Sequence, residues 1–350
     1  MKLVNIQILR FLAATSVVLF HSLGTGQNYF GPRIGGWIAV FSYGGFGVDL
    51  FFVISGFIIY YSTSQREQSA GQFLRSRLQR IVPIYWLFTI AFLATPLLIP
   101  AQIKSNDLLN PGLIASSLFY VSFLLGRMPV LFVGWSLEYE MLFYIAVSAL
   151  LYFGRRPSWN LLIACFCCLV LIGLASGPGT EGTADGAAFD FFTSPLLLEF
   201  VLGIAAARYA LQNALPWRPT LMTLATLALV ALFAAGGMHN RVAIVGSGAA
   251  LLVILAARTG RFRAEPGRIR AALAMLGDAA YSIYLVQIFT ISGACKLMKS
   301  LTPGMPLEAV VLGSTLVTLV VGYGSFILIE RPLLALCRRA KWPTIRAVAT

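Results

Sequence analysis

Two ionisable side chains, Arg10 and His21, interrupt the first apolar stretch of the sequence. On a helix their spacing places them on one face, about 16 Å apart. An ionisable group inside a bilayer costs several kcal/mol and usually marks a functional site. Near neutral pH, His is the natural general base, whereas Arg is a permanent cation. The pair indicates proton transfer beside a fixed positive charge; the alternatives are a snorkelling Arg10 and a solvated His21.

Two carboxyl groups, Glu138 and Glu140, lie together in a later apolar stretch. Two residues turn a helix by about 200°, so only one of them can easily face the interior of a bundle. Ser136, Glu140 and Tyr144 form an i, i+4, i+8 stripe, which favours Glu140 as the interior group.

Two more carboxyl groups, Asp49 and Glu199, also occur in apolar stretches. Asp49 follows Gly44, Gly45 and Gly47, and such glycines more often serve close helix packing than ligand binding. Glu199 is best explained as the structural partner of a buried Arg. Asp49 remains a candidate to orient a catalytic His.

The segment 73–86 carries the most distinctive group of cations. Arg77 and Arg80 are i, i+3 neighbours on one helix face, and Pro83 marks the expected start of a membrane helix. Arg makes bidentate contacts with phosphate, so the pair predicts a phosphate clamp. A topology signal in a cytoplasmic loop is the alternative.

The composition places these residues in a membrane protein. Of the 350 residues, 58% are hydrophobic and 11% are charged, whereas a soluble domain carries about 25% charged residues. Ten stretches are long and apolar enough to span a bilayer, which predicts an all-α, polytopic helix bundle. They are 3–23, 44–61, 81–100, 131–153, 159–175, 189–207, 219–236, 242–257, 273–294 and 307–329. The stretch 112–126 is short, and we expect it to be re-entrant or to lie at the outer surface.

The net charge of +13 fits this topology. With ten spans, 19 Lys and Arg residues lie on the side of both termini and 6 on the other side. Cytoplasmic loops carry such an excess, so we predict that both termini are cytoplasmic. The membrane topology therefore explains the positive net charge without a nucleic-acid partner. Cys165, Cys167 and Cys168 have no His or carboxylate near them in sequence, which argues against a metal site.

At these positions the sequence resembles the acyltransferase 3 family of integral membrane acyltransferases. The resemblance runs from residue 1 to about 335, so we expect a membrane domain over 1–335 and a short basic cytoplasmic tail over 336–350. The matching motifs are Arg10-x10-His21, Gly47-Val-Asp-Leu-Phe-Phe-Val-Ile-Ser-Gly-Phe57, Arg77-x-x-Arg80-Ile-x-Pro83, Trp135-Ser-Leu-x-x-Glu140-x-x-Phe143-Tyr144, Leu276-Gly-Asp-x-x-Tyr281-Ser-Ile-Tyr284-Leu and Glu330-Arg-Pro332. The opening Asn5-Ile-Gln-Ile-Leu-Arg10 is most similar to the branch that acetylates exopolysaccharides and O-antigens. One departure is Gln287, where many relatives have His.

The resemblance implies a multi-pass O-acyltransferase of the bacterial inner membrane, in the class that transfers acyl groups other than aminoacyl groups. Its donor would be cytoplasmic acetyl-CoA or another acyl-CoA, and its acceptor a hydroxyl of a surface or exported polysaccharide. It also implies that Arg10, His21, Arg77, Arg80 and Glu140 are essential. The expected partners are acyl-CoA, a glycan or lipid-linked glycan, membrane lipid and, as an option, a second copy of the chain. Neither a metal nor nucleic acid is expected.

A thioester is already activated, so acyl transfer mainly needs a base and a positioned acceptor. His21 would take the hydroxyl proton and then protonate the departing thiolate, while Glu140 or Asp49 fixes its tautomer. Arg10 would hold the donor or intermediate by its charge. A covalent acyl-His intermediate is the alternative route. Two other functions compete: a transporter, and a non-catalytic component of a polysaccharide export assembly that would tolerate loss of His21.

Overall fold

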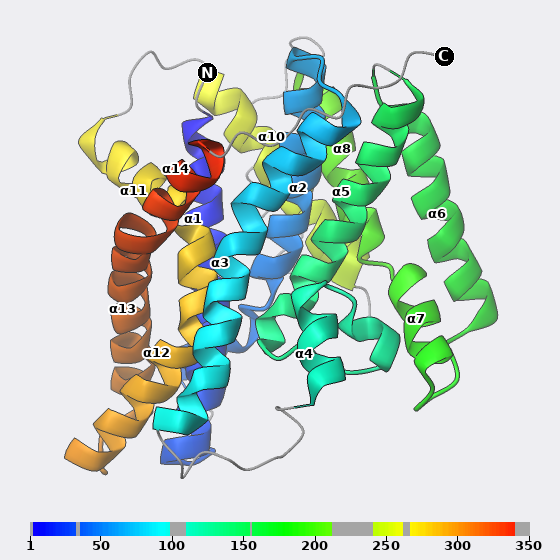
Figure 1. Ribbon diagram of the computed structural model, residues 1–350. Coiled ribbons are helices and arrows are strands. Elements are labelled where there is room, and N and C mark those ends of the chain that lie inside the picture. The colour runs from blue at the N-terminus through cyan, green and yellow to red at the C-terminus, as the bar shows by residue number, and fades with distance from the viewer. Residues whose placement is uncertain are drawn as a thin grey trace.

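The computed structural model describes residues 3–32, 36–98, 110–154, 156–211, 241–261 and 267–339. Within these ranges the chain is a bundle of helices without β-strands (Figure 1). Nine helical stretches of the described residues are long and apolar enough to cross a membrane: Val4–Phe30, Gly36–Gln65, Ala70–Thr95, Phe132–Phe153, Trp159–Ser176, Ala184–Leu211, Val242–Thr259, Ala280–Leu301 and Leu307–Arg339. Each overlaps a predicted span, which confirms the all-α polytopic bundle. The remaining predicted span, 219–236, lies outside the described residues.

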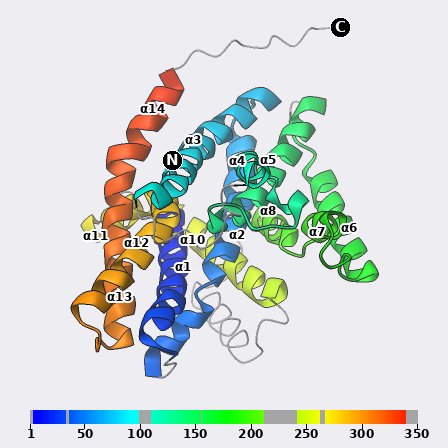
Figure 2. The ribbon, with the colours of Figure 1, turned by 60° about the horizontal axis from the view of Figure 1, so that its bottom comes forward.

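The long helices form three groups that keep the same order in two views (Figures 1 and 2). On one side stand α12 (Ala280–Leu301), α13 (Leu307–Ser325) and α14 (Arg331–Arg339), and on the opposite side stand α6 (Trp159–Ser176) and α7 (Ala184–Phe192). Between them lie α1 (Val4–Phe30), α2 (Phe46–Gln65), α3 (Ala70–Leu98), α5 (Trp135–Phe153), α8 (Leu197–Leu211) and α10 (Ser247–Arg261). Shorter elements are η1 (Gly36–Tyr43), α4 (Pro111–Leu118), η4 (Ser122–Leu125), η5 (Phe132–Gly134), η7 (Val242–Gly246), α11 (Arg268–Asp278) and η8 (Phe326–Glu330).

The glycines before Asp49 bring α1 and α2 into backbone contact. A Cβ on Gly44 would lie 2.3 Å from the carbonyl oxygen of Ser16, and one on Gly47 would lie 2.3 Å from that of Ala13. No real side chain fits at such distances, so these two glycines serve close helix packing, as predicted. Gly45 has no atom within 4 Å of such a Cβ and plays no part in this contact.

The start of the third membrane helix differs from its prediction. We expected an inner loop up to residue 80 and a helix from residue 81, but α3 begins at Ala70 and continues through Pro83. A capping box explains the early start: Ser69 N–H donates to Gln72 Oε1 at 3.1 Å, and Gln72 N–H donates to Ser69 Oγ at 3.3 Å. Within a membrane bundle, neighbouring groups make an interior Pro tolerable. Arg77 and Arg80 are therefore held on a rigid helix.

The stretch 112–126 does not span, as predicted. It forms α4 and η4, of eight and four residues, whereas a spanning helix needs about 20. Two contacts fix this segment: Trp86 Nε1–H donates to the Leu118 carbonyl at 2.9 Å, and Ser122 N–H donates to Glu138 Oε1 at 2.7 Å.

The predicted domain boundary at residue 335 falls inside α14, which continues to Arg339. Residues 340–350, the greater part of the predicted tail, lie outside the described residues. The start of α1 and the end of α14 lie toward the same side of the bundle in Figure 1.

Arg208 and Arg241 lie on either side of the undescribed segment 212–240 in the sequence. Arg208 lies over the Tyr60 ring near the end of α2, whereas Arg241 forms an ion pair with Asp49 in the first turn of α2. These two residues lie at opposite ends of α2.

Candidate active site

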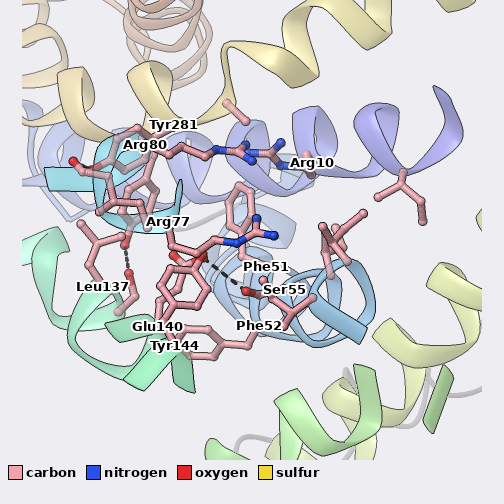
Figure 3. Close-up of a pocket in the computed structure, with 18 of the residues that line it drawn as sticks. Arg10, Phe51, Phe52, Ser55, Arg77, Arg80, Leu137, Glu140, Tyr144 and Tyr281 are labelled. Atoms are coloured by element: carbon pink, nitrogen blue, oxygen red, sulfur yellow. Dashed lines mark hydrogen bonds between the residues drawn. The ribbon is translucent and has the colours of Figure 1, made fainter. Parts of the chain in front are cut away.

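A cavity of about 300 Å³ lies between α1, α2, α3, α5 and α12 (Figure 3). Four of the six predicted site residues line it: Arg10, Arg77, Arg80 and Glu140. The remaining polar lining comes from Gln7, Ser55, Tyr61, Ser136, Tyr144, Tyr281 and Tyr284. Residues as far apart in the sequence as Gln7 and Tyr284 therefore line one cavity.

Glu140 is the carboxyl group of this cavity. Its Oε1 accepts hydrogen bonds from Ser55 Oγ at 3.2 Å and from the Tyr144 hydroxyl (Figure 3). The stripe of Ser136, Glu140 and Tyr144 on α5 lines the cavity together, which is the arrangement that the sequence predicted. The prediction that only one of the two acidic residues is interior was incomplete. Glu138 is 4% exposed, but it faces the short segment at Ser122 instead of the cavity.

Three guanidinium groups line the same cavity as the Glu140 carboxyl. Arg10 donates to Gln7 Oε1 and Arg77 donates to Ser62 Oγ, each at 3.2 Å. Figure 3 shows the guanidinium groups of Arg10 and Arg80 side by side. The Nε of Arg77 is buried and has no hydrogen-bond partner among the described residues. Because three fixed cations face one carboxyl group, the cavity lining favours an anionic guest with several acceptor oxygens.

His21 lies outside the lining of this cavity. It is half-buried on α1, between the rings of Phe20 and Phe132, with centroids 5.1 Å from each. No described residue donates a hydrogen bond to its ring or accepts one from it. The structure therefore places the predicted base, His21, outside the cavity that holds the predicted cation site.

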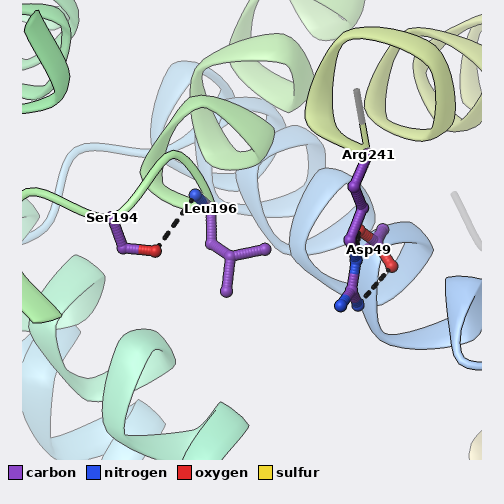
Figure 4. A network of polar contacts seen from close by, with 4 residues as sticks. All are labelled: Asp49, Ser194, Leu196 and Arg241. Atoms are coloured by element: carbon purple, nitrogen blue, oxygen red, sulfur yellow. Dashed lines mark hydrogen bonds and ion pairs between the residues drawn. The ribbon is translucent and has the colours of Figure 1, made fainter. Parts of the chain in front are cut away.

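Asp49, the other predicted orienting carboxylate, is engaged elsewhere. It is 0% exposed, and its two oxygens accept from Nε and Nη2 of Arg241, each at 2.8 Å (Figure 4). The pairing of Asp49 with His21 is therefore not what the structure shows, because Arg241 occupies both carboxylate oxygens. Glu199 is also 0% exposed and lies close to Asp49 and Arg241, but neither of its carboxylate oxygens has a hydrogen-bond partner among the described residues. The ion pair of Arg241 is with Asp49, and the role of Glu199 as the partner of a buried Arg stays a prediction.

Sequence reasoning missed the role of Arg241, which we had counted as an outer-loop charge. It also left Ser55, Tyr281 and Tyr284 without a role, although all three stand in the quoted motifs. A buried Asp49 needs a cation, and an Arg directly before a predicted span was the available signal. Among the described residues, no group of three or more His, Cys, Asp or Glu side chains is placed to hold a metal ion.

Comparison with known proteins agrees with this picture. A sequence model described as an acyltransferase domain, that of the acyltransferase 3 family, matches residues 3–329. The chain is 34% identical over 305 residues to the exopolysaccharide production protein ExoZ of Rhizobium meliloti strain 1021, covering 84% of this chain and 90% of that protein. No solved structure shows a significant match. The chain is therefore a member of the acyltransferase 3 family of membrane acyltransferases.

Proposed function

We propose that this protein transfers an acyl group, acetyl in the first instance, from cytoplasmic acyl-CoA to a hydroxyl group of an exported polysaccharide. The supporting observation is the cavity in which Arg10, Arg77 and Arg80 converge. CoA carries a pyrophosphate and a 3′-phosphate, which match this cluster of guanidinium groups. The name of the relative from Rhizobium meliloti supports exopolysaccharide as the acceptor.

The cavity volume limits how the donor can bind. About 300 Å³ is the lower end of the range for small-molecule sites, so the cavity holds part of an acyl-CoA molecule. We assign the thioester end and the adjoining arm to the cavity. The phosphates lie toward Arg77 and Arg80, near the start of α3.

The arrangement has a defined orientation in this proposal. Both termini and the start of α3 face the cytoplasm, with the protein in the bacterial inner membrane; the excess of Lys and Arg at one end of the bundle supports this orientation. The donor then enters from the cytoplasm. His21, on the far side of the cavity from the start of α1, meets the acceptor from the outer side.

In the transfer, the acceptor oxygen bonds to the thioester carbonyl carbon while the carbon–sulfur bond breaks. The hydroxyl proton passes to His21, and the CoA thiolate leaves as the thiol after taking up one proton. In a stepwise route, the acyl group first bonds to the His21 imidazole and then passes to the acceptor oxygen, which gives the same products. Both routes require the acyl carbonyl and His21 to meet, and His21 does not line the cavity to which we assign the thioester.

Titration of CoA into purified protein tests the donor site. Charged hydrogen bonds contribute about 1.5–3 kcal/mol each, so Arg77→Ala with Arg80→Ala should weaken CoA binding at least about a hundredfold. Lys at both positions should recover only part of the lost CoA affinity, because Lys cannot make the bidentate contacts that Arg makes with phosphate. Arg75→Ala is the matched control: it removes the same charge from α3 at a position that does not line the cavity. If the dissociation constant for CoA is unchanged in correctly oriented protein with both Arg77→Ala and Arg80→Ala, the phosphate clamp is rejected.

A further inference from the structure

We propose that Tyr284 and Ser136 form a barrier that separates the donor cavity from His21, and that acyl transfer proceeds only when this barrier opens. The inference rests on the proposed function. Ser136 Oγ and the Tyr284 hydroxyl are 2.8 Å apart, and the Tyr284 hydroxyl donates to the Val133 carbonyl at 2.9 Å. Together these contacts connect α12 to the first turn of α5.

The order of residues along α5 places this contact between the two compartments. Phe132, directly before α5, contacts the His21 ring. Ser136 is one turn further along, and Glu140, in the cavity, is one turn beyond that. The Ser136–Tyr284 contact therefore lies between the group that touches His21 and the carboxyl group of the cavity.

The residues of the barrier are closely packed in this structure. Ser136 and Tyr284 are each 6% exposed, and Val133 is 1% exposed. The Tyr284 ring also packs edge-on against Phe51, with centroids 6.2 Å apart. An acyl group cannot pass between helices at such a contact until the tyrosine side chain moves.

A buried polar atom lies on the far side of the barrier. The helices α1 and α12 run in the same direction: Gly277, near the end of α11 and just before α12, lies against Gln7, and Val18 and Ile291 of α12 share a core cluster further along. One turn beyond Tyr284, in the direction of His21, Gln287 is 1% exposed, and its Oε1 has no hydrogen-bond partner among the described residues. Such orphaned atoms are rare. A hydroxyl group or water that enters the passage would supply the missing donor.

The barrier has a chemical consequence, because it keeps water from the His21 side away from the thioester. If it opens without an acceptor, water attacks the thioester carbonyl carbon, the carbon–sulfur bond breaks, and the products are a free carboxylic acid and CoA thiol. Loosening the barrier should therefore raise acyl-CoA hydrolysis in the absence of glycan.

The test uses Tyr284→Phe, which keeps the ring and removes both hydroxyl contacts. Tyr281→Phe is the matched control: Tyr281 also lines the cavity and donates one hydrogen bond, but to Ile81 of α3, at 2.9 Å. The reporter is Leu137→Cys, in the cavity wall next to Ser136, with the five natural cysteines replaced by Ser. A membrane-impermeant thiol reagent is added to the His21 side of oriented vesicles.

We expect Tyr284→Phe to increase both labelling of this cysteine and glycan-free hydrolysis of acetyl-CoA about tenfold or more, from the loss of its hydroxyl contacts. Tyr281→Phe should leave the labelling rate unchanged, and Ser136→Ala should act in the same direction as Tyr284→Phe. CoA titration of each variant serves as the folding control. If all variants bind CoA and label at one rate, the barrier is rejected while the proposed function stands. If the reference protein does not bind CoA, the proposed function itself fails.

Discussion

The ion pair between Asp49 and Arg241 gives a prediction that separates a structural role of Asp49 from a catalytic one. Breaking a buried pair by removing one partner costs about 3–5 kcal/mol, because an uncompensated charge remains buried. The two side chains are unequally buried: Arg241 is 32% exposed and Asp49 is 0% exposed. Arg241→Ala therefore leaves Asp49 without solvent and beside Glu199, and we expect it to reduce the free energy of unfolding by about 3–5 kcal/mol.

Asp49→Ala should cost less, about 2 kcal/mol, because Arg241 keeps contact with solvent and can interact with Glu199. The double variant should lose less than the sum of the single losses, since the two side chains interact directly. The free energy of unfolding is measured by denaturant titration in detergent micelles, with the acyl-transfer rate measured on the folded fraction. Asp49→Asn, which keeps the shape, should lower stability and leave the rate per folded molecule near that of the wild type. If Asp49→Asn lowers the acyl-transfer rate a hundredfold and leaves the free energy of unfolding unchanged, the structural role of Asp49 is refuted.

The other predictions concern the site and the topology. His21→Ala should slow acyl transfer by about 10²–10⁴-fold while CoA binding stays unchanged, as rate and binding assays on one preparation will show. Glu140→Gln should affect donor binding as well as the rate, because its carboxyl group lies among the three cavity arginines; a rate loss with unaltered CoA affinity would contradict that placement. Met128→Cys, at a 65% exposed position, should react with a thiol reagent from outside the cell, and Arg268→Cys only from the cytoplasm; reversed labelling would overturn the orientation. Gly47→Leu should reduce the amount of folded protein, measured by gel filtration, because its side chain would meet the Ala13 carbonyl.

Local patterns in the sequence predicted the membrane helices and the cation cluster. Arg10 lies inside an apolar helix, and the stripe through Glu140 repeats at helical spacing, so residue spacing indicates which face of each of these helices points into the bundle. The position of α3 was harder to predict, because Pro83 is a strong helix-start signal in soluble proteins, whereas the Ser69–Gln72 capping box starts this helix earlier.

Long-range pairing could not be predicted from such patterns. Arg241 is 192 residues from Asp49, and both a triad with His21 and an ion pair with a distant Arg agree with a buried carboxylate. Tyr284 likewise meets Ser136 across 148 positions. The separation of His21 from the cavity follows from these contacts between helices, which helix spacing in one segment cannot reveal.

The acyl content of the host's exported polysaccharide tests the central claim most directly. Ester-linked acyl groups are counted on purified glycan from strains without this protein, with the wild-type protein, and with His21→Ala at equal membrane abundance. We predict that removal of the protein abolishes one class of O-acyl group, that the wild type restores it, and that His21→Ala does not. An unchanged acyl content in the strain that lacks the protein, or full restoration by His21→Ala, would contradict the account.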